Sequence, residues 1–233
     1  MNPTQKQTLA APARSRLRNI ELSGPAGKLE AILNEGQSNP RFAALVAHPH
    51  PLGGGTMHNK VVYHAMKALN DPAFGFAAPV LRFNFRGTGL SEGVHDGEAE
   101  QDDLLAALDW LRNAYSLPIL AVGFSFGAAM TVKACTGEKA FTVMAMALLG
   151  LPLHALGRTY LYPHLADSDV PSLLLSGSHD QFSSPDGLKD LVASSHKSKK
   201  SKTVLIEGAD HFFTSRTGEL QLELAAWLKE LEP

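Results

Sequence analysis

The chain has little cysteine, no long apolar run and almost no net charge. Its 233 residues include one cysteine, Cys135, which excludes an internal disulfide and a CxxC zinc site. No stretch approaches the roughly 18 apolar residues that a membrane-spanning helix needs. A net charge of −2 gives no general attraction to nucleic acid or to an anionic membrane. We therefore expect neither nucleic acid nor a membrane as a partner.

The N-terminal segment lacks the apolar core of a signal peptide. It begins "MNPTQKQTLAAPARSRLRN", which is polar and without periodicity. We expect residues 1–17 to form a flexible tail and the protein to be cytoplasmic. The whole chain is 44% hydrophobic and 19% charged, as in ordinary globular proteins, and the part after residue 17 has no linker or internal repeat. We predict one domain over residues 18–233.

Short apolar runs alternate with helical patterns through that domain. The runs predicted to be buried parallel strands are "FAALVAH" (42–48), "PVLRFNF" (79–85), "PILAVGF" (118–124), "TVMAMALLG" (142–150), "PSLLLSG" (171–177) and "KTVLIEG" (202–208). Two more polar runs, "RNIELSG" and "GKLEAILN", favour an antiparallel edge hairpin. Leucines at helical spacing over 104–115 and 220–231 predict amphipathic helices. The pattern predicts a doubly wound, mostly parallel sheet of about eight strands with helices on both faces.

The motif with the clearest chemistry is "GFSFG", residues 123 to 127. It follows a predicted strand and opens a predicted helix, which is the context in which G-x-S-x-G forms a nucleophile elbow. So sharp a turn holds the serine in strained backbone angles, and side chains in place of the glycines would collide with it. Ser125 is therefore the candidate nucleophile, at a helix N-terminus that favours negative charge.

A serine nucleophile needs a histidine base and an acid that orients it. In hydrolases with this elbow the order along the chain is Ser, Asp or Glu, His, each after a strand. Asp180 follows "PSLLLSGSH", and His211 follows "KTVLIEGAD". We predict the triad Ser125, Asp180 and His211. Asp210 adjoins the histidine, so we expect it to shape the turn instead.

The stretch "AHPHPLGGGTMHNK", residues 47 to 60, resembles both a metal site and a phosphate loop. An H-x-H pair followed by proline lacks the third ligand that a zinc hydrolase needs, and Asn59-Lys60-Val61 does not match a P-loop. The alternative is a loop that donates one oxyanion-hole amide. Prolines have no N–H, so the candidate donors are His50, Leu52 and the three glycines, and the amide of Phe126 is the other donor.

The chain resembles a known family at five motifs in the proper order. "HPHPLGGGTMHNKVV", "LRFNFRGTGLSEG", "GFSFG", "GSHDQF" and "GADHFF" are similar to a small bacterial branch of the α/β-hydrolase superfamily, esterase-like or dienelactone-hydrolase-like. Related hydrolases carry H-G-x-P where this chain has H-P-H-P, which favours the amide of His50, with Leu52 second. Dienelactone hydrolases carry a cysteine nucleophile, and this chain has a serine. Arg86 matches a segment that is largely structural in the superfamily.

The resemblance implies hydrolysis of carboxylic esters by an acyl-enzyme mechanism. We expect a small-molecule ester as the partner and no metal or organic cofactor, because every role has a protein group. The alternatives are a thioesterase or peptidase with the same triad, or a non-catalytic binding module. The connection from Leu151 to Val170 leaves room for one short helix, a minimal cap. We expect either that its apolar residues pack on the sheet or that some wall a small acyl pocket suited to short chains. Oligomeric state stays open.

Overall fold

The computed structural model describes residues 16–37, 39–137, 140–155, 157–193 and 201–231. The predicted tail over residues 1–17 lies outside the described residues except for its last two positions. Leu17 already begins the first strand, so the domain starts at least one residue earlier than the sequence predicted. No helix of the described ranges is both long and apolar enough to cross a membrane.

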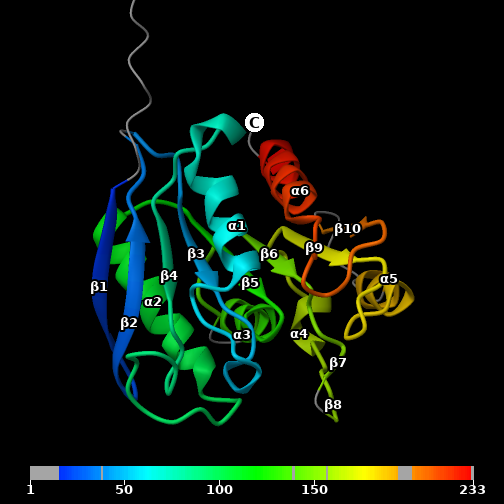
Figure 1. Cartoon of the computed structure of the whole chain (residues 1–233), viewed down its shortest axis with the longest axis horizontal. Coiled ribbons are helices and arrows are strands. Elements are labelled where there is room, and N and C mark those ends of the chain that lie inside the picture. The colour runs from blue at the N-terminus through cyan, green and yellow to red at the C-terminus, as the bar shows by residue number, and fades with distance from the viewer. Residues whose placement is uncertain (1–15, 38, 138–139, 156, 194–200, 232–233) are drawn as a thin grey trace, which may run out of the picture.

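A sheet of eight strands forms the middle of the molecule (Figure 1), in the order β1-β2-β4-β3-β5-β6-β9-β10. The strands are β1 (Leu17–Gly24), β2 (Gly27–Asn34), β3 (Ala43–Ala47), β4 (Val80–Phe83), β5 (Ile119–Phe124), β6 (Ala145–Leu149), β9 (Ser172–Gly177) and β10 (Lys202–Ile206). β1 and β2 pair antiparallel at one edge, β2 pairs antiparallel with β4, and the other six strands, β4, β3, β5, β6, β9 and β10, are parallel. All eight predicted strands are present, and the predicted fold class is confirmed.

The parallel strands are apolar on both sides because helices cover both faces of the sheet. In β3, Ala44 and Val46 pack with the helices of one face, and Ala43, Leu45 and Ala47 with those of the other. Successive side chains of a strand point to opposite faces, so a strand buried on both faces reads as a continuous apolar run.

Six α-helices lie in the described ranges. They are α1 (Lys60–Asn70), α2 (Glu100–Tyr115), α3 (Phe126–Cys135), α4 (Pro163–Ala166), α5 (Pro185–Ala193) and α6 (Thr217–Leu231). α1 and α6 cover one face of the sheet, and α2 and α3 cover the other. There are also two 3₁₀ turns, η1 (Pro51–Gly53) before α1 and η2 (Pro72–Phe74) after it. They therefore lie at opposite ends of the parallel strands (Figure 1).

The connection between β6 and β9 holds more structure than the sequence predicted. The predicted short helix is present as α4, but a two-stranded antiparallel ribbon, β7 (His154–Ala155) with β8 (Arg158–Thr159), precedes it. Strands of two residues give no readable alternation, which is why the sequence did not predict them. The ribbon lies at the edge of the sheet where the parallel strands end (Figure 1).

An ion pair inside the domain holds the loop after β4. Arg86 and Asp103 of α2 meet at 2.7 Å, and the Asp103 side chain is fully buried. The guanidinium donates to both carboxylate oxygens, and the Arg86 N–H donates to the same carboxylate. This bidentate pair fixes the loop to the helix, in agreement with the structural role that the resemblance implied for Arg86.

Candidate active site

Ser125 lies on a strained turn between β5 and α3. Its backbone angles are φ 54° and ψ −117°, a combination that L-residues rarely adopt. The Ser125 carbonyl accepts from the N–H groups of Ala128 and Ala129, so the helix begins directly after the serine. The turn therefore projects the hydroxyl beyond the sheet edge, at the N-terminus of α3, as the motif predicted.

The two glycines of the motif are required by close backbone neighbours. A Cβ at Gly123 would lie 2.3 Å from the Gly127 carbonyl oxygen, inside the turn itself. A Cβ at Gly127 would lie 2.6 Å from the carbonyl oxygens of both Ala47 and His48, at the end of β3. The collision at Gly123 was the predicted one, whereas Gly127 is needed because α3 packs against the neighbouring strand end.

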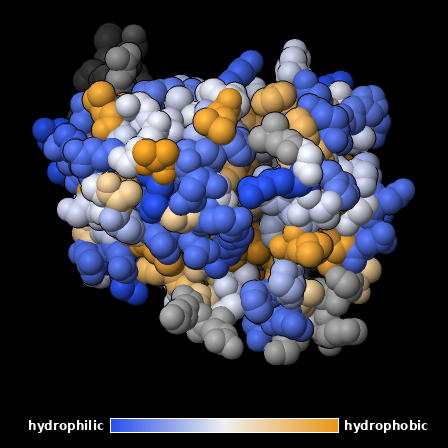
Figure 2. Space-filling model, turned by 90° about the horizontal axis from the view of Figure 1, so that it is seen from below, coloured by the Kyte–Doolittle hydropathy of each residue, from blue (hydrophilic) through white to orange (hydrophobic). Residues whose placement is uncertain are grey.

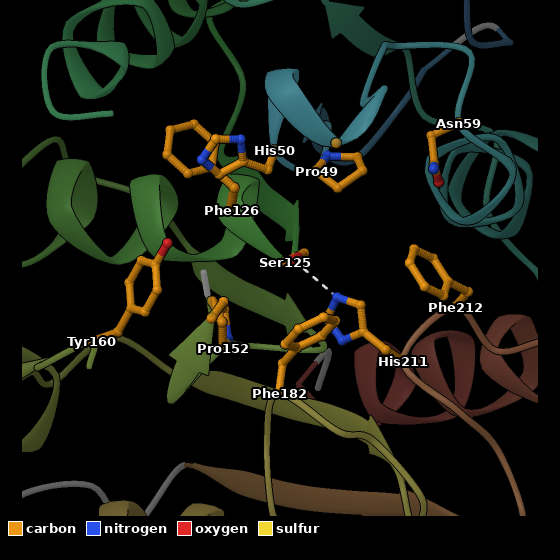
Figure 3. A pocket seen from close by; sticks show the side chains of 12 residues that line it. Pro49, His50, Asn59, Ser125, Phe126, Pro152, Tyr160, Phe182, His211 and Phe212 are labelled. Carbon is orange, nitrogen blue, oxygen red and sulfur yellow. Dashed lines mark hydrogen bonds between the residues drawn. The ribbon is translucent and has the colours of Figure 1, made fainter. Parts of the chain in front are cut away.

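The sequence-predicted partners of Ser125 lie beside it. The distance from His211 Nε2 to Ser125 Oγ is 2.9 Å, and His211 Nδ1 lies 2.8 Å and 3.0 Å from the two carboxylate oxygens of Asp180 (Figure 3). Because an ionised carboxylate only accepts, Nδ1 carries the proton, and Nε2 is left to accept from the serine. The serine lies on the turn after β5, and Asp180 and His211 lie in the loops after β9 and β10.

Further groups hold the acid and the base in place. The Asp180 carboxylate accepts from the Ser176 hydroxyl at 2.8 Å and from the Phe182 N–H at 2.9 Å. The His211 ring is 2% exposed and packs between the rings of Phe124 and Phe182, with centroids at 5.1 Å and 4.7 Å. Sequence reasoning missed these supports. Ser176 was within reach, because it is the last hydroxyl residue of the strand that leads to Asp180.

Asp210, the rejected candidate, shapes the turn that carries the histidine. Its carboxylate accepts from the N–H groups of Phe212 and Thr214 and from the Thr214 hydroxyl. These bonds, led by that of the Thr214 N–H, lower the pKa of Asp210. Cys135 ends α3 in the core, where burial raises the pKa of its thiol to about 12 and leaves it unreactive.

The histidines of residues 47 to 60 have separate tasks. His48 is fully buried, accepts from the Phe85 N–H through Nε2 at 3.0 Å and donates from Nδ1 to the Pro49 carbonyl at 2.6 Å. Burial lowers the pKa of His48 to about 4, so the ring is neutral at pH 7. His50 caps η1, and His58 is exposed. The described ranges contain no cluster of three histidine, cysteine or acidic side chains positioned to hold a metal.

The amides of the same loop divide into used and unused donors. The Leu52 N–H donates to His50 Nδ1, and the N–H groups of the three glycines donate to the carbonyls of His50 and Pro51. Within the described ranges, the N–H groups of His50 and Phe126 have no acceptor. Both residues line the cavity that contains Ser125. The free donors are thus the two that the sequence favoured, and Leu52 is engaged elsewhere.

A cavity of about 140 Å³ opens beside Ser125. Its wall is mostly apolar and is formed by Pro49, His50, Gly53, Asn59, Ser125, Phe126, Pro152, Ala155, Tyr160, Phe182, His211 and Phe212. In Figure 3 these side chains surround the serine hydroxyl, with Tyr160 and Phe212 on opposite sides of it. Figure 2 views this edge of the sheet and shows apolar surface on it among hydrophilic side chains. Exposed Leu52, Leu161 and Phe212 belong to its loops.

The apolar residues of the connection between β6 and β9 differ in their surroundings: some line the cavity, some pack on the core and one is exposed. Tyr160 walls the cavity. Leu153 packs on the core and Tyr162 is buried, its hydroxyl donating to the Pro152 carbonyl at 2.6 Å. Leu161 is 80% exposed. Leu156 lies outside the described residues. Part of the segment therefore packs on the core and part lines the cavity, where Pro152 and Ala155 are wall residues that the sequence did not single out.

The arrangement is that of a serine hydrolase, and comparison with known proteins agrees. The family described as "Alpha/beta hydrolase domain" matches residues 42–229, and the chain belongs to this family. An uncharacterized protein of Rickettsia prowazekii is 36% identical over 215 residues, covering 90% of this chain and 87% of the relative.

Two solved structures carry the same fold. An α/β serine hydrolase homologue from Coxiella burnetii is 32% identical with a TM-score of 0.78, and the match covers 90% of this chain and 96% of that one. A serine hydrolase without lid from Xanthomonas campestris is 27% identical with a TM-score of 0.79, covering 96% and 97% of the two chains. Fold and family together identify an α/β serine hydrolase.

Proposed function

We propose that this protein hydrolyses carboxylic esters with short acyl groups, with Ser125 as nucleophile, His211 as general base and Asp180 as the residue that orients it. The observation that supports this most directly is the continuous chain of hydrogen bonds from Ser125 Oγ through the His211 ring to Asp180. A hydroxyl is a poor nucleophile at neutral pH, and this chain supplies the base that activates it.

The proposed reaction has two halves. Ser125 Oγ attacks the ester carbonyl carbon while His211 Nε2 takes the hydroxyl proton, and the resulting oxyanion accepts from the N–H groups of His50 and Phe126. The bond to the leaving alcohol then breaks as His211 returns the proton to it, which leaves an acyl-enzyme. Water attacks the acyl carbon with His211 again as base, and the acid and the free serine are released.

Removal of the nucleophile tests the function. Ser125→Ala should lower kcat on p-nitrophenyl acetate by about 10⁴- to 10⁶-fold, since the triad acts as a unit. A fluorophosphonate probe should label the wild-type protein and not this variant. Cys135→Ala is the control and should be labelled normally. An unlabelled wild-type protein would instead favour the non-catalytic binding module, and faster turnover of thioesters or amides than of esters would move the proposal to a thioesterase or peptidase.

The volume of the cavity is evidence for short acyl groups in the substrate. Its volume of about 140 Å³ is close to that of an engineered apolar cavity of ~150 Å³ that holds one benzene molecule. Like benzene, the part of an acyl group that fits this space has about six carbon atoms. Each further methylene must lie outside the cavity and so loses the roughly 0.8 kcal/mol that its burial would contribute. We therefore expect kcat/KM to peak between acetyl and hexanoyl esters.

A series of p-nitrophenyl esters checks this limit. Tyr160→Ala should move the optimum to longer chains because it removes one wall of the cavity. Leu161→Ala is the matched control, since this neighbour is exposed and does not line the cavity. A wild-type optimum at dodecanoyl esters or longer would contradict the proposed substrate size.

A further inference from the structure

Two 3₁₀ turns of this chain are built in the same way. Each has a cap residue, a proline, two further residues and a glycine in the left-handed region: His50 to Gly54 (φ 76°) in η1, and Asp71 to Gly75 (φ 92°) in η2. In both, the glycine N–H donates to the proline carbonyl, and the cap side chain accepts from the N–H two residues on. The turn needs a cap acceptor, and aspartate meets that need in η2.

The histidine cap of η1 is neutral. An N–H can only donate, so the Leu52 N–H, 3.2 Å from His50 Nδ1, requires that this nitrogen carry a lone pair. The ring proton therefore resides on Nε2. Burial, followed by the nearby His95, lowers the pKa of His50 below its ordinary value, against an opposing effect of Glu100. The cap stays uncharged at neutral pH.

The orientation of that ring is fixed from two sides. The His50 ring packs on Phe126, with centroids 4.9 Å apart, and on His95 at 4.7 Å. His95 is itself anchored, because its Nδ1 lies 2.7 Å from the fully buried Glu100 carboxylate, which also accepts from the Asp96 and Gly97 N–H groups. Figure 3 shows the His50 and Phe126 side chains together at one side of Ser125.

We propose that the His50 side chain is a positioning residue that caps the oxyanion loop without placing negative charge beside the oxyanion. This inference rests on the proposed function, in which the backbone N–H of the same residue is an oxyanion donor. A carboxylate cap like Asp71 would hold the turn equally well, but its charge would oppose the charge that develops in the transition state. The η2 turn has no such neighbour and carries the carboxylate.

Substitutions at position 50 separate the cap from its charge. Asn59 shows that asparagine can make this cap: with φ −52° and ψ 142°, close to the −53° and 124° of His50, its side chain accepts from the Val61 N–H at 2.9 Å. His50→Asn removes the ring that lines the cavity but keeps the cap, so it should keep the melting temperature near wild type and lose less kcat than His50→Ala. His50→Asp should keep the melting temperature of His50→Asn and have a kcat about 30-fold below that of His50→Asn, with KM unchanged. His50→Ala should lower both the melting temperature and kcat.

A short alkylboronic acid gives a second measurement, since its adduct with the serine carries the negative charge of the transition state. Its affinity should fall for His50→Asp by the same factor as kcat/KM, and His58→Ala, in an exposed part of the same loop, should match wild type. Equal kcat for the Asn and Asp variants would overturn the role of charge, and equal kcat for Asn and Ala would overturn the cap. If Ser125→Ala retains activity, the proposed function fails as well, which distinguishes the two failures.

Discussion

The turns η1 and η2 have the same backbone conformation but lie at opposite ends of the parallel strands. η1 follows β3 at the end where Ser125, Asp180 and His211 meet, whereas η2 follows α1 at the other end (Figure 1). Around η1, amides and rings face the cavity; at η2, Asp71 simply accepts from the Ala73 N–H at 3.0 Å. The comparison teaches that local sequence sets the turn, and that the neighbours of the turn decide whether it supports chemistry.

Of all the substitutions, Asp-to-Asn at position 180 and at position 71 should differ most in their effect on kcat. Asp180→Asn places an amide against the His211 ring, which favours the wrong tautomer, so kcat should fall about 10⁴-fold. Asp71→Asn keeps an acceptor for the Ala73 N–H and should leave kcat unchanged, with the free energy of unfolding altered by less than about 0.5 kcal/mol. Kinetics on p-nitrophenyl acetate and urea unfolding measure both. A loss of less than tenfold for Asp180→Asn would contradict the assigned role.

Acid should destabilise the edge that carries η1. The pKa of His48, directly before this turn, is about 4 in the folded chain against an ordinary 6.5, because the ring is buried. Between these values the unfolded chain binds more protons, so the stabilisation is complete above about pH 6.5 and is lost as the pH falls toward about 4, by roughly 3 kcal/mol. Urea unfolding at several pH values checks this. His48→Gln cannot titrate and should lack this part of the decline; an unchanged decline would contradict the assignment.

Substitution of the left-handed glycines that end η1 and η2 should give the smallest effects, and the two losses of stability should be nearly equal. Gly54→Ala and Gly75→Ala each place a side chain at positive φ, which should lower the free energy of unfolding by about 1 kcal/mol. The Cβ at Gly54 meets no atom within 4 Å, and the one at Gly75 lies 3.2 Å from the flexible end of Lys229. Only Gly54→Ala should also lower kcat. An equal loss of activity in both variants would show that the turns are not functionally distinct.

Much of the fold was predictable because burial leaves a direct trace in sequence. Strands covered on both faces read as continuous apolar runs, and all six such runs became parallel strands. The ribbon β7–β8 was missed because two-residue strands leave no periodic pattern. Its contribution to the site, Ala155 on the cavity wall, comes from its place above the sheet edge and not from any local pattern.

The features of the site can also be separated into those that local sequence determines and those that tertiary contacts determine. By itself the sequence determined the sharp turn at Ser125, since Gly123 is a local requirement of that backbone, and it determined the order of the strands after which Asp180 and His211 follow. Within the loop, the N–H groups of Leu52 and the three glycines all donate to acceptors at His50 and Pro51, so the local turn leaves the His50 amide free. Only the tertiary structure decided that His50 and Phe126 line one cavity with Ser125, and that His95, held by Glu100, packs on His50. Contacts between distant segments form when the sheet brings strand ends together, and no local pattern records them.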